Sequence, residues 1–354
     1  MMKLIVHLLG LGLSLMLAGC EHRPLEENSD LHYVRVYLDE HIRNVHYGFY
    51  DESKKKPEYK APTMMRITLN DPQSGKMKAE TYLRNSGSDE RGKYIDGHIA
   101  ARPGTYNLIA YSFDTQSTHV RNKEDYYNMQ VYTNPISRQL MDMLVSVRSE
   151  NETTEGTGPT DWNIRYEPDH FFVTSCEQIT VSDKAYTDTL YNSRGEHFQA
   201  QTTVETYYLQ VNVKGIEYVK NAVSLITGMA ESTLMHNQTM VSDPPASVYF
   251  NLNPGTNTAR KEENMAVAYA SFNTFGKLED VEGFIEVTFE FNTIYETTQT
   301  ETIRVTDMFE TEQVKDKRWI IIDKVIEIIP PEGATGGMNP GVDKWENIEG
   351  NITV

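Results

Sequence analysis

The residue in the most distinctive chemical setting is Cys20, which follows a charged start at Lys3 and an apolar run over residues 4–17. It is preceded directly by Leu17, Ala18 and Gly19. The small side chains of Ala18 and Gly19 give a peptidase access to the bond before Cys20, and a cysteine thiol at that point can be alkylated with a diacylglyceryl group. The sequence therefore predicts a signal peptide over residues 1–19 and lipid modification of Cys20.

The tetrapeptide Leu17-Ala18-Gly19-Cys20 resembles the lipobox of bacterial lipoproteins. Each buried CH₂ of an acyl chain contributes about 0.8 kcal/mol to membrane binding, so two or three chains hold a protein firmly. The apolar run is too short to span a bilayer comfortably, and the residues after Cys20 are polar. We expect residues 20–30 to be a lipidated tether. An ordinary secretory signal with a chance cysteine is the alternative.

Catalytic chemistry finds no support in the motifs of this chain. The patterns His-Glu-x-x-His, Gly-x-Ser-x-Gly, the P-loop and paired Cys-x-x-Cys do not occur, so the usual metal, acyl-transfer and nucleotide sites lack their residues at the required spacing. Cys176, the second of two cysteines, is expected to be a small core or edge residue and not a nucleophile. With Cys20 acylated, no intramolecular disulfide can form. We predict no catalytic residues, no cofactor and no enzyme.

Several individual residues are of types that bind metal ions or sugars. His41 and His46, with His32 nearby, could bind zinc, but their spacing places them on opposite faces of a strand. Acidic segments at Asp89-Glu90 and residues 150–155 lack the regular order of a calcium loop and fit a solvated acidic face. We predict no metal site. The three tryptophans, which are scattered along the chain, are expected to be core anchors: Trp162, Trp319 and Trp345. Stacking on sugar rings is the alternative.

The composition restricts the partners. The formal net charge is −18, and it becomes one unit more negative when Lys3 leaves with the signal peptide. Such a surface repels phosphate backbones, so nucleic acid is not an expected partner. The mature chain is longer than one hydrophobic core usually serves, and its 21 tyrosines suit half-buried strands. Two β-rich domains are the expectation.

The first half of the chain shows the period-2 alternation of strands with one buried face. Strands are expected over residues 31–38, 65–69, 78–83, 105–113 and 171–173. Pro103-Gly104 forms a tight turn into the fourth of these. Residues 136–148 fit a short helix or a strand, and the two are not separable from the pattern. We predict an N-terminal β-sandwich over residues 31–190.

The second half begins after a polar boundary region in residues 184–202. Seven strands are expected over residues 203–213, 219–227, 247–252, 265–275, 284–294, 298–305 and 319–329. The first of these changes its alternation near Tyr207, which predicts a bulge or bend there. Residues 308–319 are charged and fit a short turn or helix, and the final 25 residues are a Gly/Pro-rich segment with one possible last strand. We predict a C-terminal β-sandwich over residues 200–354.

Three stretches carry a resemblance to a known family. They are Gly97-His98-Ile99 with Pro103 to Thr115, residues 218–230, and Ser271-Phe272-Asn273-Thr274-Phe275-Gly276. Together with the lipobox, the acidic tether and the Gly/Pro-rich end, they resemble the fimbrillin-related accessory and anchoring lipoproteins of gut and oral anaerobes. This group includes a family long labelled as a domain of unknown function.

The resemblance implies an all-β fold of two tandem transthyretin-like Greek-key β-sandwich domains behind the signal peptide. It also implies an outer-membrane lipoprotein at the cell surface that binds a fimbrial subunit by strand addition. In related polymerising subunits a protease removes the first strand after an arginine, but neither Arg35 nor Arg43 has a convincing cleavage context, so we expect that strand to be retained. The competing interpretation is a surface lipoprotein that binds glycan or host protein. An anchor needs an open sheet edge, whereas a glycan binder needs an aromatic surface.

Overall fold

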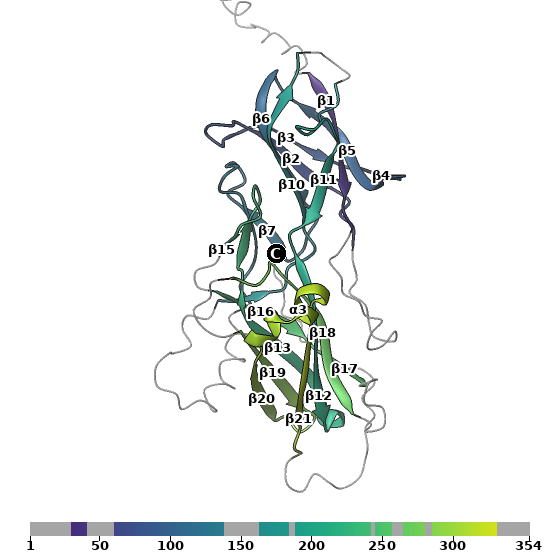
Figure 1. The fold of residues 1–354 in the computed structure, drawn as a ribbon, viewed down its shortest axis with the longest axis vertical. Helices are drawn as coiled ribbons and strands as arrows, with labels where there is room; N and C mark the ends of the chain where they lie inside the picture. The colour runs from purple at the N-terminus through teal and green to yellow at the C-terminus, as the bar shows by residue number, and fades with distance from the viewer. Residues whose placement is uncertain are drawn as a thin grey trace, which may run out of the picture.

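The computed structural model describes residues 30–40, 60–137, 163–183, 188–241, 245–256, 265–279 and 285–330. Figure 1 shows an elongated molecule with strands from the beginning of the chain at one end and strands from its later part at the other. Between the two ends lies a smaller sheet built from both halves of the chain. The lipobox residues Leu17, Ala18, Gly19 and Cys20 lie outside the described residues, as do residues 138–162.

An eight-stranded sheet forms the N-terminal sandwich. In sheet order its strands are β3 (Met77–Leu83), β2 (Met65–Asn70), β6 (Gly104–Ser112), β10 (Phe172–Val181), β11 (Phe198–Thr202), β1 (Leu31–Leu38), β5 (Gly92–Ala100) and β4 (Asn85–Asp89). β11 pairs antiparallel with β10 and parallel with β1, so it links the two halves of the sheet. The halves enclose one core cluster to which seven of these strands contribute, including Val34, Ile67, Ile95, Leu108 and Phe172.

Alternation along β1 distinguishes the buried face of this sandwich from its outer face. Val34, Val36 and Leu38 are buried in the core, whereas Tyr33 and Arg35 alternate with them on the opposite face and remain half-exposed. Because successive side chains of a strand point to opposite faces, the pattern requires one covered face and one outer face.

Two facing sheets form the C-terminal sandwich. One has the order β17 (Asn253–Thr256), β18 (Ala266–Thr274), β12 (Glu205–Lys214) and β21 (Trp319–Glu327). The other has the order β20 (Thr298–Arg304), β19 (Glu286–Thr293), β13 (Val219–Met229), β16 (Ala246–Asn251) and β9 (Ile164–Tyr166). Their facing sides share the largest core cluster, in which the rings of Phe250 and Phe272 stack with centroids 4.2 Å apart.

The middle sheet has the order β15 (Met240–Val241), β14 (Ser232–Leu234), β8 (Gln130–Thr133) and β7 (Thr118–Arg121). Its core cluster joins Val131 and Met235 to Ile109 and Val173, which come from β6 and β10 of the N-terminal sandwich. β8 pairs with β14, and β9 pairs in parallel with β16. Strands from before residue 190 therefore pair with strands from after residue 200. The division of the chain into domains at residues 31–190 and 200–354 remains a prediction.

Short helical turns follow the strands of the C-terminal sandwich: η3 (Ile216–Tyr218), η5 (Thr306–Glu310) and α3 (Glu312–Lys317). The Thr311 side chain accepts a hydrogen bond from the backbone of Val314 and caps α3, while Arg318 ends it in the left-handed region at φ 58°. The prediction of a turn or short helix before Trp319 is confirmed.

The predicted all-β sandwich class is confirmed, and each of the seven strands expected in the second half corresponds to a strand of the C-terminal sandwich. The expected bulge near Tyr207 is wrong. β12 pairs with β18 without interruption from Glu205 to Val213. The alternation is blurred because both faces of β12 are covered: Tyr207 lies in the main core, and Tyr208 lies in a separate cluster with Trp319. Trp319 is thus a buried anchor, as predicted.

Candidate functional site

The possible zinc ligand His32 and the possible nucleophile Cys176 both lie in strands, whereas Asp89 of the acidic pair Asp89-Glu90 lies at the end of β4 and accepts hydrogen bonds from Arg35 and Tyr37. His32 is fully buried on β1, and Cys176 is a half-buried free thiol on β10 that packs partly against the N-terminal core. His41, His46 and the acidic run 150–155 lie outside the described residues. Within the described part of the chain, no group of three or more His, Cys, Asp or Glu side chains is arranged to hold a metal ion.

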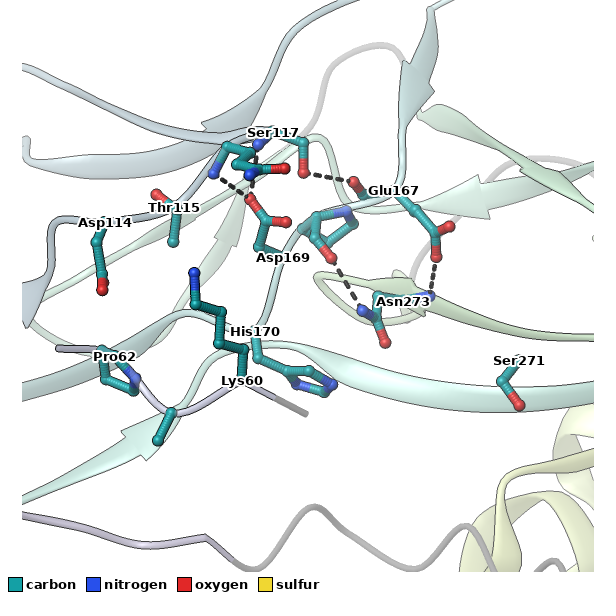
Figure 2. A pocket seen from close by; sticks show the side chains of 13 residues that line it. Lys60, Pro62, Asp114, Thr115, Ser117, Glu167, Asp169, His170, Ser271 and Asn273 are labelled. Carbon is teal, nitrogen blue, oxygen red and sulfur yellow. Dashed lines mark hydrogen bonds between the residues drawn. The ribbon is translucent and has the colours of Figure 1, made fainter. Parts of the chain in front are cut away.

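The structure places a polar cavity of about 380 Å³ where the chain returns from the C-terminal sandwich to the N-terminal one. We call it the junction cavity. Its wall includes the crossing segment, residues 167–170, which connects β9 to β10. Figure 2 shows Lys60 and Asp114 on one side of this cavity and Asn273 of β18 on the other.

Asp169 holds the crossing segment to the loop before β7. Its Oδ2 atom accepts hydrogen bonds from the backbone N–H groups of Gln116, Ser117 and Thr118 at 2.7, 2.6 and 3.2 Å. In return, the backbone N–H of Asp169 donates to the Thr118 hydroxyl at 2.8 Å. A carboxylate that accepts several backbone N–H groups forms strong charge-assisted hydrogen bonds. Asp169 therefore fixes the geometry of this side of the junction (Figure 2).

Glu167 and Asn273 hold the other side. The backbone N–H of Asn273 donates to Glu167 Oε2 at 3.1 Å, and the Asn273 side-chain amide donates to the carbonyl oxygen of Pro168 at 3.0 Å. The Asn273 side-chain oxygen in turn accepts from the Thr206 hydroxyl on β12 at 2.7 Å. The crossing segment is thus bonded to β18, and Asn273 in turn is bonded to β12.

Burial at this junction alters the acidity of two side chains. It raises the pKa of Glu167 from 4.5 to about 7; the Asn273 N–H opposes this rise and the negative charge of Asp169 adds to it. Burial also lowers the pKa of His170 below its usual value, against the opposing effect of Asp169. Asp169 Oδ2, Glu167 Oε2 and the Pro168 carbonyl oxygen all accept hydrogen bonds that hold the crossing segment in place, so the geometry describes a structural clamp between the sandwiches.

A second feature is the pair of outer strands on one side of the C-terminal sandwich. Among the described strands, β20 pairs only with β19, and β21 pairs only with β12. Side chains join these two edges: Gln299 Nε2 donates to the carbonyl oxygen of Glu327 at 2.7 Å, and Lys324 forms an ion pair with Glu301. Apolar side chains are exposed along β21 and just beyond it, at Val325 and Ile329. We call this side the β20/β21 edge.

The opposite side of the C-terminal sandwich is closed by the chain itself. β16 ends at Asn251 in one sheet and β17 begins at Asn253 in the other, with buried Leu252 between them. The backbone therefore crosses between the sheets there. On the β20/β21 side the backbone also crosses, where residues 305–318 connect the end of β20 to the start of β21, and along the two strands the side chains of Gln299, Glu301 and Lys324 link them. Sequence reasoning identified β20 and β21 as strands but had no signal for their position at the edge.

Comparison with known proteins gives a family and a full-length relative. A family profile described as "Domain of unknown function (DUF5119)" matches residues 51–251, more than half of the chain. A Bacteroides ovatus protein named as a candidate fimbrium anchoring subunit, Fim4B, is 23% identical over 364 aligned positions, which cover 95% of this chain and 94% of that protein.

Among solved structures, a candidate adhesin from Bacteroides ovatus superposes with a TM-score of 0.55 at 19% identity, over 89% of this chain and 98% of that one. At this identity the similarity establishes the shared fold alone. The fimbrial anchor protein Mfa2 from Porphyromonas gingivalis is more distant, with a TM-score of 0.42 and 10% identity over 84% of this chain and 90% of that one, and it supports no separate conclusion. The resemblance to a fimbrial accessory family inferred from sequence is confirmed.

Proposed function

The chain belongs to the family described as Domain of unknown function (DUF5119), and from that premise we propose that it is a non-catalytic fimbrial accessory or anchoring subunit. The observation that carries the proposal is the match to the Bacteroides ovatus protein named as a fimbrium anchoring subunit, which extends over nearly the full length of both chains. A match of this extent includes both sandwiches and the junction between them.

In this proposal the protein is tethered to the outer membrane through lipid on Cys20 and faces the cell surface. The support is the lipobox Leu17-Ala18-Gly19-Cys20, followed by the polar tether. The part of the chain that the structure describes contains no helix long and apolar enough to cross a membrane. Lipid chains would then supply the membrane affinity.

The fimbrial subunit binds by adding a strand to the β20/β21 edge. An outer strand presents backbone N–H and C=O groups that can pair with another chain, and apolar side chains beside it give the added strand a surface to cover. Val325 and Ile329 are exposed at this edge. The side chains of Gln299 and of the Lys324–Glu301 pair link β20 to β21, and the two strands are not paired with each other in the described sheets.

The anchor keeps its first strand. β1 lies between β11 and β5, and both of its neighbours are paired to it. The Arg35 guanidinium lies 3.8 Å from the centroid of the Tyr94 ring and forms ion pairs with Asp89 and Asp96. A protease would have to disrupt these contacts to cut after Arg35, so this arginine is poorly placed for cleavage.

The test is to purify the full-length lipoprotein from membranes of its native host and identify the proteins that remain bound. Wild type should recover fimbrial subunits, and the double variant Val325→Lys/Ile329→Lys should recover several-fold less, because charge on an edge strand opposes strand pairing. Tyr191→Lys is the matched control, since Tyr191 is an exposed aromatic residue of the N-terminal half, outside the C-terminal sandwich.

Two outcomes decide the proposal. If wild type recovers no fimbrial protein, and cells that lack the gene make normal fimbriae, the anchoring function is wrong. If fimbrial subunits bind wild type and the double variant equally, the function stands and the β20/β21 edge is not the binding site.

A further inference from the structure

A second cavity, of about 340 Å³, lies between the end of β6 and the β7–β8 hairpin. We call it the β7 cavity. Three short segments line it, and they contribute the side chains of Phe113, His119, Lys123, Tyr132 and Asn134. Its volume is near the lower end of the range of small-molecule sites, about 300–1,000 Å³, which suits one ring-sized group.

The lining of the β7 cavity contains no carboxylate, although the whole chain has a net charge of −18. The junction cavity, in contrast, is lined by Asp114, Glu167 and Asp169. Lys123 lines the β7 cavity and forms no salt bridge with any other described residue. A cation in a wall without acids favours an anionic group in the ligand.

The acidic residues next to Lys123 in the chain do not contradict this charge pattern. Glu124 and Asp125 follow it directly, but neither lines the cavity. The Asp125 carboxylate accepts hydrogen bonds from the Tyr127 backbone at 3.1 Å and the Asn128 side chain at 2.8 Å. Asp125 is therefore engaged within its own turn.

Aromatic rings supply a second kind of surface in the same wall. Phe113 is 39% exposed, and the edge-on Tyr82 ring supports it with centroids 4.9 Å apart. Tyr132 lies beside His119, with centroids 5.9 Å apart. Exposing a phenylalanine costs hydrophobic free energy, so a ligand with an apolar ring face would be stabilised by covering it.

Polar groups that can bind hydroxyls complete the wall. The Asn134 side-chain nitrogen lies 2.9 Å from His119 Nε2, so these two side chains, one directly after β8 and the other on β7, orient each other. An amide and an imidazole held in place can donate and accept hydrogen bonds without a large loss of side-chain entropy.

We propose that the β7 cavity binds one anionic sugar residue, such as a hexuronic acid unit at the end of a polysaccharide. The carboxylate of the sugar pairs with Lys123, one face of its ring covers Phe113, and its hydroxyls bond to Asn134 and His119. An acidic peptide side chain would satisfy Lys123 but leave the aromatic wall exposed, so the sugar is the better match. This activity is separate from fimbrial anchoring and lies in the middle sheet, away from the β20/β21 edge.

The test uses the full-length protein in detergent micelles and titrates it with digalacturonic acid by calorimetry and ligand-observed NMR. The wild type should bind it, while the neutral digalactose and sodium acetate should bind at least ten-fold more weakly. Lys123→Gln and Phe113→Ala should each weaken binding about ten-fold or more, as expected for loss of a charge-assisted hydrogen bond or a buried ring. The matched controls are Lys60→Gln, in the junction cavity, and Tyr191→Ala, an exposed ring elsewhere.

Binding of acetate or a glutamate-rich peptide as tightly as the uronate would overturn the sugar assignment. Equal losses in Lys123→Gln and Lys60→Gln would show general charge attraction instead of this cavity, and no binding of any uronate would end the proposal. Fimbrial assembly in cells that carry Lys123→Gln should remain normal, which separates failure here from failure of the anchoring function.

Discussion

Gln299 on β20 donates its side-chain amide to the carbonyl oxygen of Glu327 at the end of β21, with an N···O distance of 2.7 Å. The backbone N–H of Ile329 approaches the oxygen of the same side chain at 3.4 Å. The side-chain amide of Gln299 therefore contacts a backbone carbonyl and a backbone N–H of the segment 327–329. A paired strand would contact the same kinds of groups. Gln299 substitutes for a missing backbone partner at this edge.

Replacing Gln299 with alanine should expose that part of the edge. Loss of one such hydrogen bond costs about 0.5–1.5 kcal/mol of stability, and the exposed groups favour pairing between copies. We expect a concentration-dependent dimer for Gln299→Ala in analytical ultracentrifugation. Gln199→Ala changes an exposed glutamine of the N-terminal sandwich and should sediment as the wild type does. Identical sedimentation of both variants would contradict the capping role.

The raised pKa of Glu167 predicts a stability that falls as pH rises. The unfolded chain releases this proton near pH 4.5 and the folded chain near pH 7, so the folded state binds more protons between these values and loses stability as pH increases through them. Glu167→Gln keeps a hydrogen-bond acceptor and removes the titration. The melting temperature of the variant should therefore rise relative to wild type from pH 4.5 to pH 8. Glu196→Gln, at an exposed position, should show no such trend. A difference that does not change with pH would exclude this role of Glu167.

Removal of the Asp169 carboxylate should loosen the junction. Three backbone N–H groups lose their acceptor in Asp169→Ala, and hydrogen bonds to a charged group contribute about 1.5–3 kcal/mol each before rearrangement and water replace them. We expect a loss of about 2 kcal/mol or more in thermal or urea unfolding, with faster hydrogen exchange at residues 116–118. Asp183→Ala, at an exposed position, should change stability by less than about 0.5 kcal/mol. Unchanged exchange at residues 116–118 would show that Asp169 does not hold this loop.

If Cys20 carries the lipid, acylation of the protein should depend on this cysteine. Cells fed an alkyne analogue of palmitate should label the wild-type protein, and Cys20→Ser should lose the label and leave the membrane fraction, because the acyl chains supply the membrane affinity. Cys176→Ser is the matched control: it removes the other cysteine, which is a free thiol on β10. Retention of label in Cys20→Ser would place the modification elsewhere.

Much of the strand content was predictable because local burial leaves a local pattern. β1 alternates buried and half-exposed residues from His32 to Val36, and the predicted limits of this strand match the observed ones. β9 has only three residues and β15 only two, which is too short for any alternation to be recognised. The error at Tyr207 has the related cause that a strand covered on both faces shows no alternation.

The candidate sites also differ in whether they depend on neighbouring residues or on residues far apart in the chain. The predicted lipobox could be recognised from sequence because the chemistry it predicts depends on four consecutive residues, Leu17 to Cys20. The junction could not be predicted, because Asp169 bonds to backbone groups more than 50 residues away, at Gln116 to Thr118. The β7 cavity likewise depends on the approach of Phe113 to a separate hairpin.

By itself, the sequence determined the four-residue motif that predicts lipid modification, the β class, most strands of the C-terminal half and the acidic character that makes nucleic acid an unexpected partner. These properties follow from side-chain chemistry at neighbouring positions. Only the tertiary structure decided that β8 pairs with β14 about a hundred residues later, that Glu167 is desolvated, and that β20 and β21 are edges. The physical reason is that each strand satisfies its backbone hydrogen bonds with distant partners, so its neighbours depend on how the whole chain packs.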